Sequence, residues 1–391
     1  MAYTTINDPS AYFQFAMWTS TASAQSITND GNSDLQGDML ILIARDNSDH
    51  KRIHDTTRGN LPAFLETSGH AWGGTVVCSD ETSGTGTFAA TNYDVVFDSD
   101  GFTVGSGFIT GYWLTPQWKA NGGSTSSNTD GTITSTVQAD TTAGFSIVKY
   151  AGTGTAGTIG HGLGAVPKMI WIKHRGPLGG HGDERPEIDG EDWAVWHKAL
   201  SSSAHSIDIS RGDVESDTDD FWDSTYPTSS VFSVAGSSDE VNSTHSNDSD
   251  GYMAYCWTDI QGYSKFGSWV GTGIADKGPF VYTGFRPECI IIRGIDGGDR
   301  EMSILDGRRV KDHDGTDAQY NPVRERSSLT NSTGNHAYHT AFDTVDICAN
   351  GFKILGVPQH YTINKTGVTY LYAAWAKHPF VTSTGIPGTA R

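Results

Sequence analysis

The feature that most constrains the fold is a set of five short sequence signatures that recurs three times in one order. One signature is an apolar strand that opens on Pro or Gly. Residues 167–173 match residues 287–293 position by position, and residues 37–43 are a looser copy. An aromatic residue precedes each copy at a nearly constant distance; these residues are Trp18, Tyr150 and Trp269. The chain is therefore expected to contain three copies of one unit.

The remaining signatures follow in the same order in each unit. A third strand is predicted at residues 53–55, 195–197 and 304–306. A polar turn with a strand follows at residues 100–104, 230–234 and 350–354. Each unit closes on an aromatic strand that ends at Trp118, Trp257 or Trp375. The Tyr-to-Trp spacing in the first closing strand is one residue longer than in the others, which predicts an extra residue or a bulge there.

These signatures divide the chain into units and connecting segments. The expected repeats are residues 13–120, 145–264 and 265–380. Residues 1–12 form an N-terminal arm, and residues 381–391 form a C-terminal tail. Residues 121–144 are rich in Gly, Ser and Thr without an apolar pattern, and they are expected to be a linker. Residues 262–269 pass directly from one unit to the next, so the second and third units should pack rigidly.

The strand patterns indicate an all-β protein of three tandem antiparallel β-sandwich-like repeats. The predicted strands are short, rich in β-branched and aromatic residues, and bounded by Gly, Asn, Asp and Ser. No segment carries a clear helical apolar stripe. A single large barrel or a helix-capped α+β domain is the alternative. Cys256 and Cys289 lie in apolar strands and are expected to be buried free thiols.

Charge and hydropathy exclude several classes of partner. The chain has 26 Lys and Arg against 45 Asp and Glu, a net charge of −19, so binding of nucleic acid through its phosphates is not expected. No apolar run approaches the roughly 18 residues of a membrane-spanning helix, which argues against membrane insertion. The first residues lack the basic segment and apolar core of a signal peptide. We therefore expect a soluble protein that folds where it is made.

Several of these motifs resemble those of a family of marine bacteriophage virion proteins. The similar segments are residues 145–154, 159–170, 262–268 and 278–287. The resemblance covers residues 145–380 well and residues 3–60 more loosely. Members of this family are mostly identified as tail fibres or other virion structural proteins, and the resemblance supplies no catalytic residues. It implies a location in the virion after synthesis in the host cytoplasm.

The expected function is that of a non-enzymatic tail fibre or spike on the particle exterior, which contacts the host surface. A head or tail decoration protein without a receptor role is the alternative. A glycan depolymerase is less favoured, because the acidic residues 183–192 form a carboxylate-rich run that is more simply a solvated insertion. We expect a homotrimer, since fibres are commonly closed oligomers, with residues 1–12 bound to other virion proteins.

A host-surface glycan is the expected ligand, and exposed tryptophans beside carboxylates are the expected site. The candidate residues are Trp193, Trp196, Trp222, Asp219, Asp220 and Asp223, together with Trp72. Trp222 and Trp72 lack counterparts in the other units, which favours a binding role over a core role. No cofactor is expected. His174, His181, His197, His336 and His339 are expected to be surface histidines rather than metal ligands. The Asp-rich residues 29–34 and 247–251 favour Asx-turns, with calcium binding left open.

Overall fold

A computed structural model describes most of the chain as antiparallel β-structure. The described residues are 3–44, 52–64, 95–174, 193–208, 214–217, 220–236, 238, 240–244, 251–274, 277–297, 302–307, 322–323, 327–328, 345–355 and 363–387. Within them one short 3₁₀ helix, η1 (Pro9–Ala11), accompanies the strands, and there is no α-helix. No helix of this part of the chain is long and apolar enough to cross a membrane. The expectation of an all-β protein of antiparallel sandwich-like repeats is confirmed.

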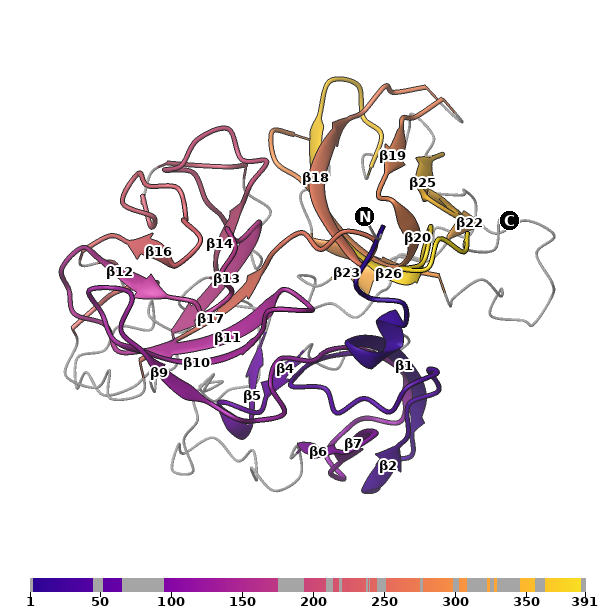
Figure 1. Cartoon of the computed structure of the whole chain (residues 1–391), viewed down its shortest axis with the longest axis horizontal. Helices are drawn as coiled ribbons and strands as arrows, with labels where there is room; N and C mark the ends of the chain where they lie inside the picture. The colour runs from indigo at the N-terminus through magenta and orange to yellow at the C-terminus, as the bar shows by residue number, and fades with distance from the viewer. Residues whose placement is uncertain are drawn as a thin grey trace.

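Three lobes with the same strand order make up the fold (Figure 1). We call them repeats 1, 2 and 3. Each has a large sheet with the order opening strand, closing strand, apolar strand, third strand and fourth strand. A smaller sheet covers one face of each large sheet, which gives a sandwich.

Each repeat builds its two sheets from strands in the following spatial order. In repeat 1 the large sheet contains β1 (Phe13–Ser20), β8 (Gly111–Trp118), β3 (Met39–Ala44), β4 (Arg52–Asp55) and β5 (Gly59–Phe64), and the small sheet contains β2 (Gln25–Ile27), β7 (Gly101–Val104) and β6 (Val95–Asp98). In repeat 2 they are β11 (Phe145–Tyr150), β17 (Tyr252–Trp257), β13 (Met169–His174), β14 (Ala194–His197) and β15 (Ile207–Asp208), with β12 (Gly157–Gly160) and β16 (Val231–Val234). In repeat 3 they are β18 (Ser264–Val270), β26 (Thr369–Pro379), β20 (Phe285–Gly294), β21 (Ser303–Asp306) and β23 (Ser327–Ser328), with β19 (Phe280–Tyr282), β25 (Gly351–Ile354), β24 (Val345–Cys348) and β22 (Pro322–Val323).

Strand register shows that the three closing tryptophans are equivalent. On the apolar strand, Trp118 pairs with Met39, Trp257 with Met169, and Trp375 with Cys289. These partners occupy the same place in the repeated signature, as the sequence predicts. Equivalent residues in the three repeats are found by counting along each strand from the closing tryptophan and its partner.

The expected bulge in the first closing strand is absent. β1 and β8 pair without a register shift, and Trp113 lies opposite Trp18. Tyr252 lies opposite Tyr150 in repeat 2, and Tyr370 lies opposite Trp269 in repeat 3. All three cross-strand pairs are stacked, with ring centroids 5.4, 5.2 and 5.4 Å apart. A tryptophan has therefore replaced the tyrosine at this position, and the neighbouring Tyr112 accounts for the longer apparent spacing.

The expected linker is also wrong, because residues 121–144 contain two strands. These are β9 (Ser126–Asn128) and β10 (Ser135–Asp140), which extend the large sheet of repeat 2 beyond β11. Val137 and Gln138 of β10 are buried. The segment before them is anchored to repeat 1, because the carboxylate of Asp38 accepts hydrogen bonds from the backbone N–H groups of Ala120 and Gly123 at 2.7 and 2.9 Å.

The apolar strand of each large sheet, β3, β13 or β20, is buried on both faces, which explains the uninterrupted apolar runs in the sequence. In β3, Leu40 and Leu42 point into the sandwich core of repeat 1. Met39, Ile41 and Ile43 point the other way, into a core that contains residues from all three repeats. Because side chains alternate along a strand, one apolar strand supplies both cores.

The three closing tryptophans meet at the centre of the molecule. The ring centroid of Trp118 lies 6.2 Å from that of Trp257 and 5.1 Å from that of Trp375. The Trp257 and Trp375 centroids lie 6.3 Å apart. Three equivalent residues in mutual contact define an approximate threefold arrangement within one chain. We call this cluster the tryptophan triad.

The N-terminal arm packs on repeat 3 of its own chain. The Tyr3 hydroxyl donates to the carbonyl of Gly284 at 2.7 Å, and Asn7 donates to the hydroxyl of Ser383 at 2.7 Å. Ile6 is buried. The N-terminus accordingly lies beside the lobe that contains β18 and β26 (Figure 1). The arm is therefore part of the fold, and its expected attachment to other proteins stays a prediction.

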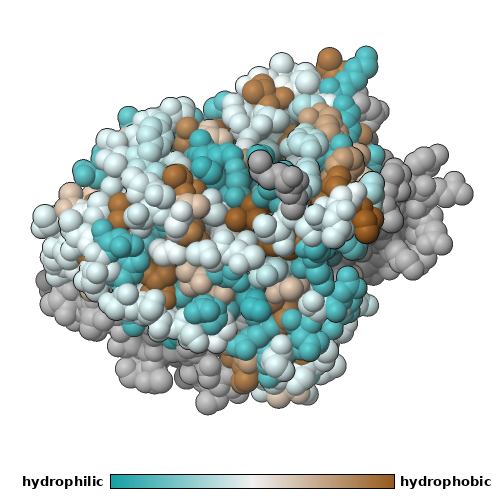
Figure 2. All heavy atoms as spheres, in the orientation of Figure 1, coloured by the Kyte–Doolittle hydropathy of each residue, from teal (hydrophilic) through white to brown (hydrophobic). Residues whose placement is uncertain are grey.

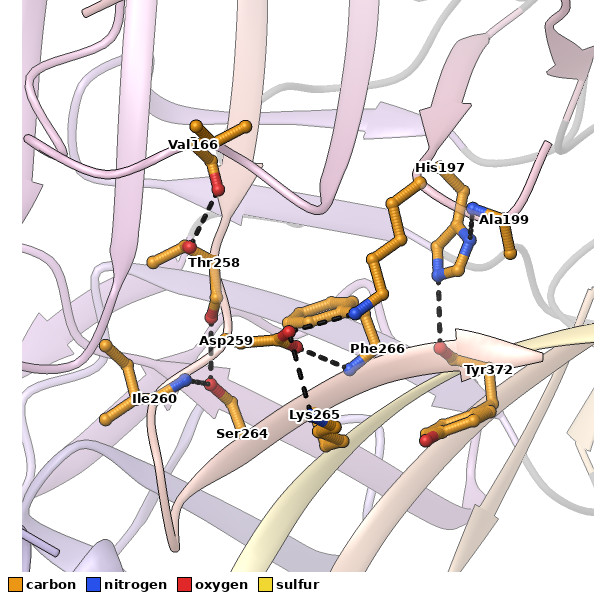
Figure 3. A network of polar contacts seen from close by, with 11 residues as sticks. Val166, His197, Ala199, Thr258, Asp259, Ile260, Ser264, Lys265, Phe266 and Tyr372 are labelled. Atoms are coloured by element: carbon orange, nitrogen blue, oxygen red, sulfur yellow. Dashed lines mark hydrogen bonds and ion pairs between the residues drawn. The ribbon is translucent and has the colours of Figure 1, made fainter. Parts of the chain in front are cut away.

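The junction between repeats 2 and 3 is held by a polar network around Asp259 (Figure 3). Its carboxylate accepts a hydrogen bond from the backbone N–H of Phe266 at 2.8 Å and pairs with the ammonium group of Lys198 at 2.9 Å. The Ser264 hydroxyl donates to the carbonyl of Thr258 at 2.9 Å. Side chains from both repeats therefore bridge the short connection, and the two units pack directly on each other; the rigidity of this packing stays a prediction.

His197 adds a buried contact at the same junction. Its Nε2 atom lies 3.1 Å from the carbonyl oxygen of Tyr372, and its Nδ1 accepts from the N–H of Ala199 at 3.1 Å. Burial lowers the pKa of His197 to about 3, a shift that the hydrogen bond to Tyr372 opposes. The imidazole is therefore neutral in the folded protein. It is not the surface histidine that the sequence suggested.

The neutral state of His197 predicts an acid-sensitive stability. Between about pH 6.5, the ordinary pKa of histidine, and the folded value of about 3, the unfolded chain binds a proton that the folded chain does not. Stability should therefore fall as the pH drops through this window, by up to about 1.4 kcal/mol per pH unit. Urea unfolding of His197→Gln should show a shallower fall than wild type. Equal slopes for wild type and His197→Gln would contradict this assignment.

The tryptophan triad predicts that the three repeats unfold together. Trp118→Ala should destabilise the protein by about 3–5 kcal/mol, the usual cost of truncating a core aromatic residue. The buried thiols Cys256 and Cys289 report on repeats 2 and 3. Both should become reactive at the same lower urea concentration in the variant, as measured by thiol labelling and peptide mass spectrometry. Unchanged protection of both thiols would show that repeat 1 unfolds independently.

Candidate functional site

The tryptophans proposed from sequence as a glycan-binding surface are core residues. Trp193, Trp196 and Trp222 have exposed fractions of 0%, 3% and 2%. Trp193 packs between Trp171 and Tyr255, with ring centroids 6.2 Å from each. A ring whose faces are covered by protein cannot stack on a sugar. The expectation of an exposed tryptophan site is therefore wrong for these three residues.

The carboxylates predicted beside them serve a local turn. Asp220 accepts hydrogen bonds from the backbone N–H and the hydroxyl of Ser224 at 2.7 and 2.8 Å. Asp223 is exposed. Asp219 and Trp72 lie outside the described residues. The described members of the predicted set do not converge on one binding surface.

The predicted histidines form no metal site in the described part of the chain. His181, His336 and His339 lie outside it, and His197 is buried at the repeat junction. No group of three or more His, Cys, Asp or Glu side chains is arranged for a metal ion among the described residues.

The structure exposes a different aromatic pair, on the outer face of the small sheet of repeat 3. Phe280 and Tyr282 are the first and last residues of β19, and their exposed fractions are 45% and 55%. Val281 between them points into the sandwich core. On the face of the molecule shown in Figure 2, hydrophobic residues lie in small separate patches among polar ones. Two exposed aromatic residues on one side of one strand are consequently a candidate binding site.

Cross-strand neighbours place charged groups beside this pair. Phe280 lies opposite Lys353 on β25, which in turn lies opposite Asp346 on β24. Tyr282 lies opposite Gly351. A Cβ on Gly351 would lie 2.9 Å from the Phe280 ring and would clash with the carbonyl of Val281, so the ring needs glycine beneath it. Lys353 also donates to the carbonyl of Gly278, which holds its side chain on the sheet.

The N-terminal arm completes the surface with a second tyrosine. The hydroxyl groups of Tyr3 and Tyr282 lie 3.3 Å apart. Burial, the hydrogen bond to Tyr282 and the charge that Tyr282 would carry raise the pKa of Tyr3, so its hydroxyl keeps its proton. We call the surface formed by Tyr3, Phe280, Tyr282, Lys353 and Asp346 the repeat-3 aromatic surface. It offers two ring faces, a hydroxyl pair, a cation and a carboxylate.

The aromatic residues are specific to repeat 3. Ser26 of β2 and Thr158 of β12 occupy the position of Phe280 in repeats 1 and 2, opposite Thr103 and Ser233. The sequence signal for this site is the alternation of Phe280, Val281 and Tyr282 at a place where the other repeats carry small polar residues. A prediction based on the number of tryptophans and carboxylates in a segment does not detect this alternation.

Comparison with known proteins assigns the chain to one family. Residues 8–379 match a family described as a domain of unknown function, DUF7483. The chain belongs to this family. The match spans all three repeats, so the whole threefold arrangement is the family's unit. Neither the curated proteins nor the solved structures contain a match to the chain.

The burial of Trp222 predicts the effect of its removal. Trp222→Ala should lower stability by about 3–5 kcal/mol, because a core aromatic side chain is lost and a cavity remains. Tyr226→Ala is the control, since Tyr226 lies four residues away and is 58% exposed; it should change stability by less than about 1 kcal/mol. Thermal unfolding followed by circular dichroism measures both. A Trp222→Ala protein as stable as wild type would contradict the core assignment.

Proposed function

We propose that this protein is a non-enzymatic structural component of the exterior of a bacteriophage particle, a tail fibre or spike that contacts a glycan on the host surface. The likeness of residues 145–154 and 262–268 to phage virion proteins supports the phage assignment. The repeat-3 aromatic surface is the observation that carries the proposed host contact. In this proposal Phe280 and Tyr282 stack on sugar rings.

The chemistry of the surface suits a carbohydrate ligand. The apolar faces of sugar rings stack on aromatic side chains, and a small number of polar groups fix the orientation of the ligand. The hydroxyls of Tyr3 and Tyr282 and the charged ends of Lys353 and Asp346 are such groups. Two aromatic side chains spaced two residues apart on one strand lie on the same face of the sheet. They can therefore contact neighbouring rings of a chain of sugars.

The scaffold beneath the surface also suits recognition. The aromatic residues sit on a sheet strand rather than on a loop, and their backbone is fixed by pairing with β25. A binding surface on regular structure loses little conformational entropy when a ligand binds. The tryptophan triad then connects this lobe to the rest of the chain through a shared core.

A decoration protein without a receptor role is the second candidate. The burial of Trp193, Trp196 and Trp222 favours it, because these residues were the sequence-based support for a receptor site. In that case the chain would reinforce the particle, and the repeat-3 aromatic surface would contact another particle protein. The two candidates differ in what removal of the aromatic residues does to host adsorption.

The adsorption test uses Tyr282→Ala and Phe280→Ala in particles that carry the variant protein. Loss of stacking on one aromatic residue costs about 1–3 kcal/mol on comparable nucleic-acid surfaces, which corresponds to roughly five- to 150-fold weaker binding. Thermal stability should stay within about 1 kcal/mol of wild type, because both side chains are exposed. Tyr112→Ala is the matched control, since Tyr112 is 47% exposed in repeat 1, away from this surface.

Three outcomes would separate the candidates. Weaker adsorption by both repeat-3 variants, with normal particle assembly and a normal Tyr112→Ala control, supports host contact. Unchanged adsorption by stable Tyr282→Ala particles would contradict host contact at this surface. Poor incorporation of the variant protein into particles would favour the decoration role.

A further inference from the structure

A polar cleft lies where repeat 3 meets repeat 1. Its volume is about 550 Å³, and its walls come from β1, from η1 and the loop at residues 30–32, and from β20 and β26. A segment of chain connects repeat 1 to repeat 2 and repeat 2 to repeat 3, but no segment connects repeat 3 to repeat 1. The cleft therefore marks the place where the approximate threefold arrangement closes without a covalent link.

The corresponding place between repeats 1 and 2 is occupied by β10. The side-chain amide of Gln138 donates to the hydroxyl of Thr56 at 2.8 Å and accepts from the backbone N–H of Asn121 at 3.2 Å. By strand register, Gly307 in repeat 3 is equivalent to Thr56, and His378 is equivalent to Asn121. Both Gly307 and His378 line the cleft.

A second pair of residues in repeat 1 also has equivalents in the cleft of repeat 3. Asp38 in repeat 1 accepts hydrogen bonds from the segment that leads to β10, including the N–H of Ala120. Their equivalents in repeat 3 are Glu288 and Lys377, whose charged atoms lie 3.5 Å apart in the wall of the cleft. Four cleft residues are thus the equivalents of those that surround the end of β10. The residues around the cleft are therefore equivalent to those that surround β10, but no segment connecting two repeats supplies a strand here.

The contact between repeats 2 and 3 is instead bridged by side chains. There the carboxylate of Asp259 binds the N–H of Phe266, which points away from the sheet at the edge of β18. Lys198 takes the place of Thr56 and pairs with the same carboxylate. Side chains therefore close this contact directly.

The edge of β1 that borders the cleft carries outward-facing main-chain groups. The N–H of Lys119 donates to the carbonyl of Tyr12 at 2.9 Å, so the main-chain groups of Tyr12 point toward β8. Because orientation alternates along an antiparallel strand, those of Phe13, Phe15, Met17 and Thr19 point away from β8. Met17 and Thr19 are exposed. Their equivalents in repeat 2 include Lys149, which pairs with Thr136 of β10. The carbonyl of Thr19 accepts a hydrogen bond from the side-chain amide of Gln25 at 2.9 Å, so Met17 is the residue whose main chain can bind another strand.

Charge in the cleft favours an occupant that donates hydrogen bonds. Among the described residues that line the cleft, Asp8, Asp30 and Glu288 contribute three carboxylates and Lys377 one ammonium group. The carboxylate of Asp8 already accepts hydrogen bonds from Ser10 and Ser33, so Glu288 is the group that an occupant would approach. Burial and the neighbouring Lys377 lower the pKa of His378, while Glu288 and Asp8 oppose the shift, so this imidazole is neutral near pH 7. A side chain with an amide or a positive charge would complement this set, as the amide of Gln138 does in the first contact.

We propose that the outer edge of β1 binds an extended segment of a partner polypeptide, which adds to the large sheet of repeat 1 in the way that β10 adds to that of repeat 2. The segment runs antiparallel to β1 and places an amide or cationic side chain in the cleft beside Glu288. Main-chain hydrogen bonds to Met17 supply affinity, and the cleft selects the side chain. This inference does not depend on the proposed glycan contact.

A synthetic peptide with the sequence of residues 133–142, Ile-Thr-Ser-Thr-Val-Gln-Ala-Asp-Thr-Thr, is the probe. Binding of the fluorescent peptide to the full-length protein is measured by fluorescence anisotropy, and amide hydrogen exchange locates it. We expect saturable binding with slower exchange at Met17. Replacing Gln with Lys in the peptide should maintain or strengthen binding, and a scrambled peptide should bind at least tenfold more weakly.

Protein variants test the edge itself. Met17→Pro removes an outward N–H and leaves the pairing with β8 in place, since proline is tolerated at sheet edges. It should weaken peptide binding about tenfold, the effect of one lost hydrogen bond at the upper end of the usual range. Met17→Ala keeps the N–H and should bind within about twofold of wild type. Ser268→Pro, at the equivalent position of β18, should also leave binding unchanged.

A further variant keeps the proposal testable if Met17→Pro does not fold. Gly307→Gln places a side chain in the cleft and leaves β1 intact; a Cβ at Gly307 meets no atom closer than 3.4 Å. It should weaken peptide binding while thermal stability is retained. Absence of saturable binding, equal binding of the scrambled peptide, or loss of binding in Ser268→Pro but not in Met17→Pro would each overturn the proposal.

Discussion

The contact among Trp118, Trp257 and Trp375 is the interaction on which the architecture depends. Each tryptophan ends the closing strand of one repeat, and each touches the other two. A two-layer sandwich buries only one face of its large sheet, and here the second face is also apolar. Packing three such faces against one another removes that surface from water, which is the main favourable term in folding. The three repeats therefore share a common core and are not separate domains.

Much of this architecture could be predicted from the sequence because it rests on local patterns that recur. The apolar strand, the third strand and the closing tryptophan are recognisable by strand alternation and by repetition. The strand β10 could not be recognised in this way. Its residues Ser135–Asp140 are mostly polar, and their pairing depends on the neighbouring edge of β11 rather than on their own composition. The wrongly predicted bulge has a similar cause, since Tyr112 and Trp113 are two adjacent aromatic residues and only one of them occupies the repeated position.

The candidate site was harder to predict than the fold for a physical reason. Trp222 lacks a sequence counterpart in the other repeats, and from the sequence alone this uniqueness suggests exposure. A residue without a counterpart can equally be a core residue, and Trp222 is buried. Phe280 is also unique to its repeat, but it stands at an outward position of a strand whose inward neighbour, Val281, is core. The difference between the buried Trp222 and the exposed Phe280 therefore depends on which face of its strand or loop a side chain occupies, and not on the type of residue.

Joining the three repeats in one chain has a consequence for how the central core responds to dilution. In an oligomer assembled from separate subunits, the stability of a shared core falls as the protein concentration falls. Here the segments that connect the repeats hold the three tryptophans together at any concentration. Covalent connection also lets each copy change its outer face alone, whereas one substitution in a homotrimer appears three times. The outer face of a single lobe can thus change, as the exposed Phe280 and Tyr282 of repeat 3 illustrate, while all three lobes preserve the centre.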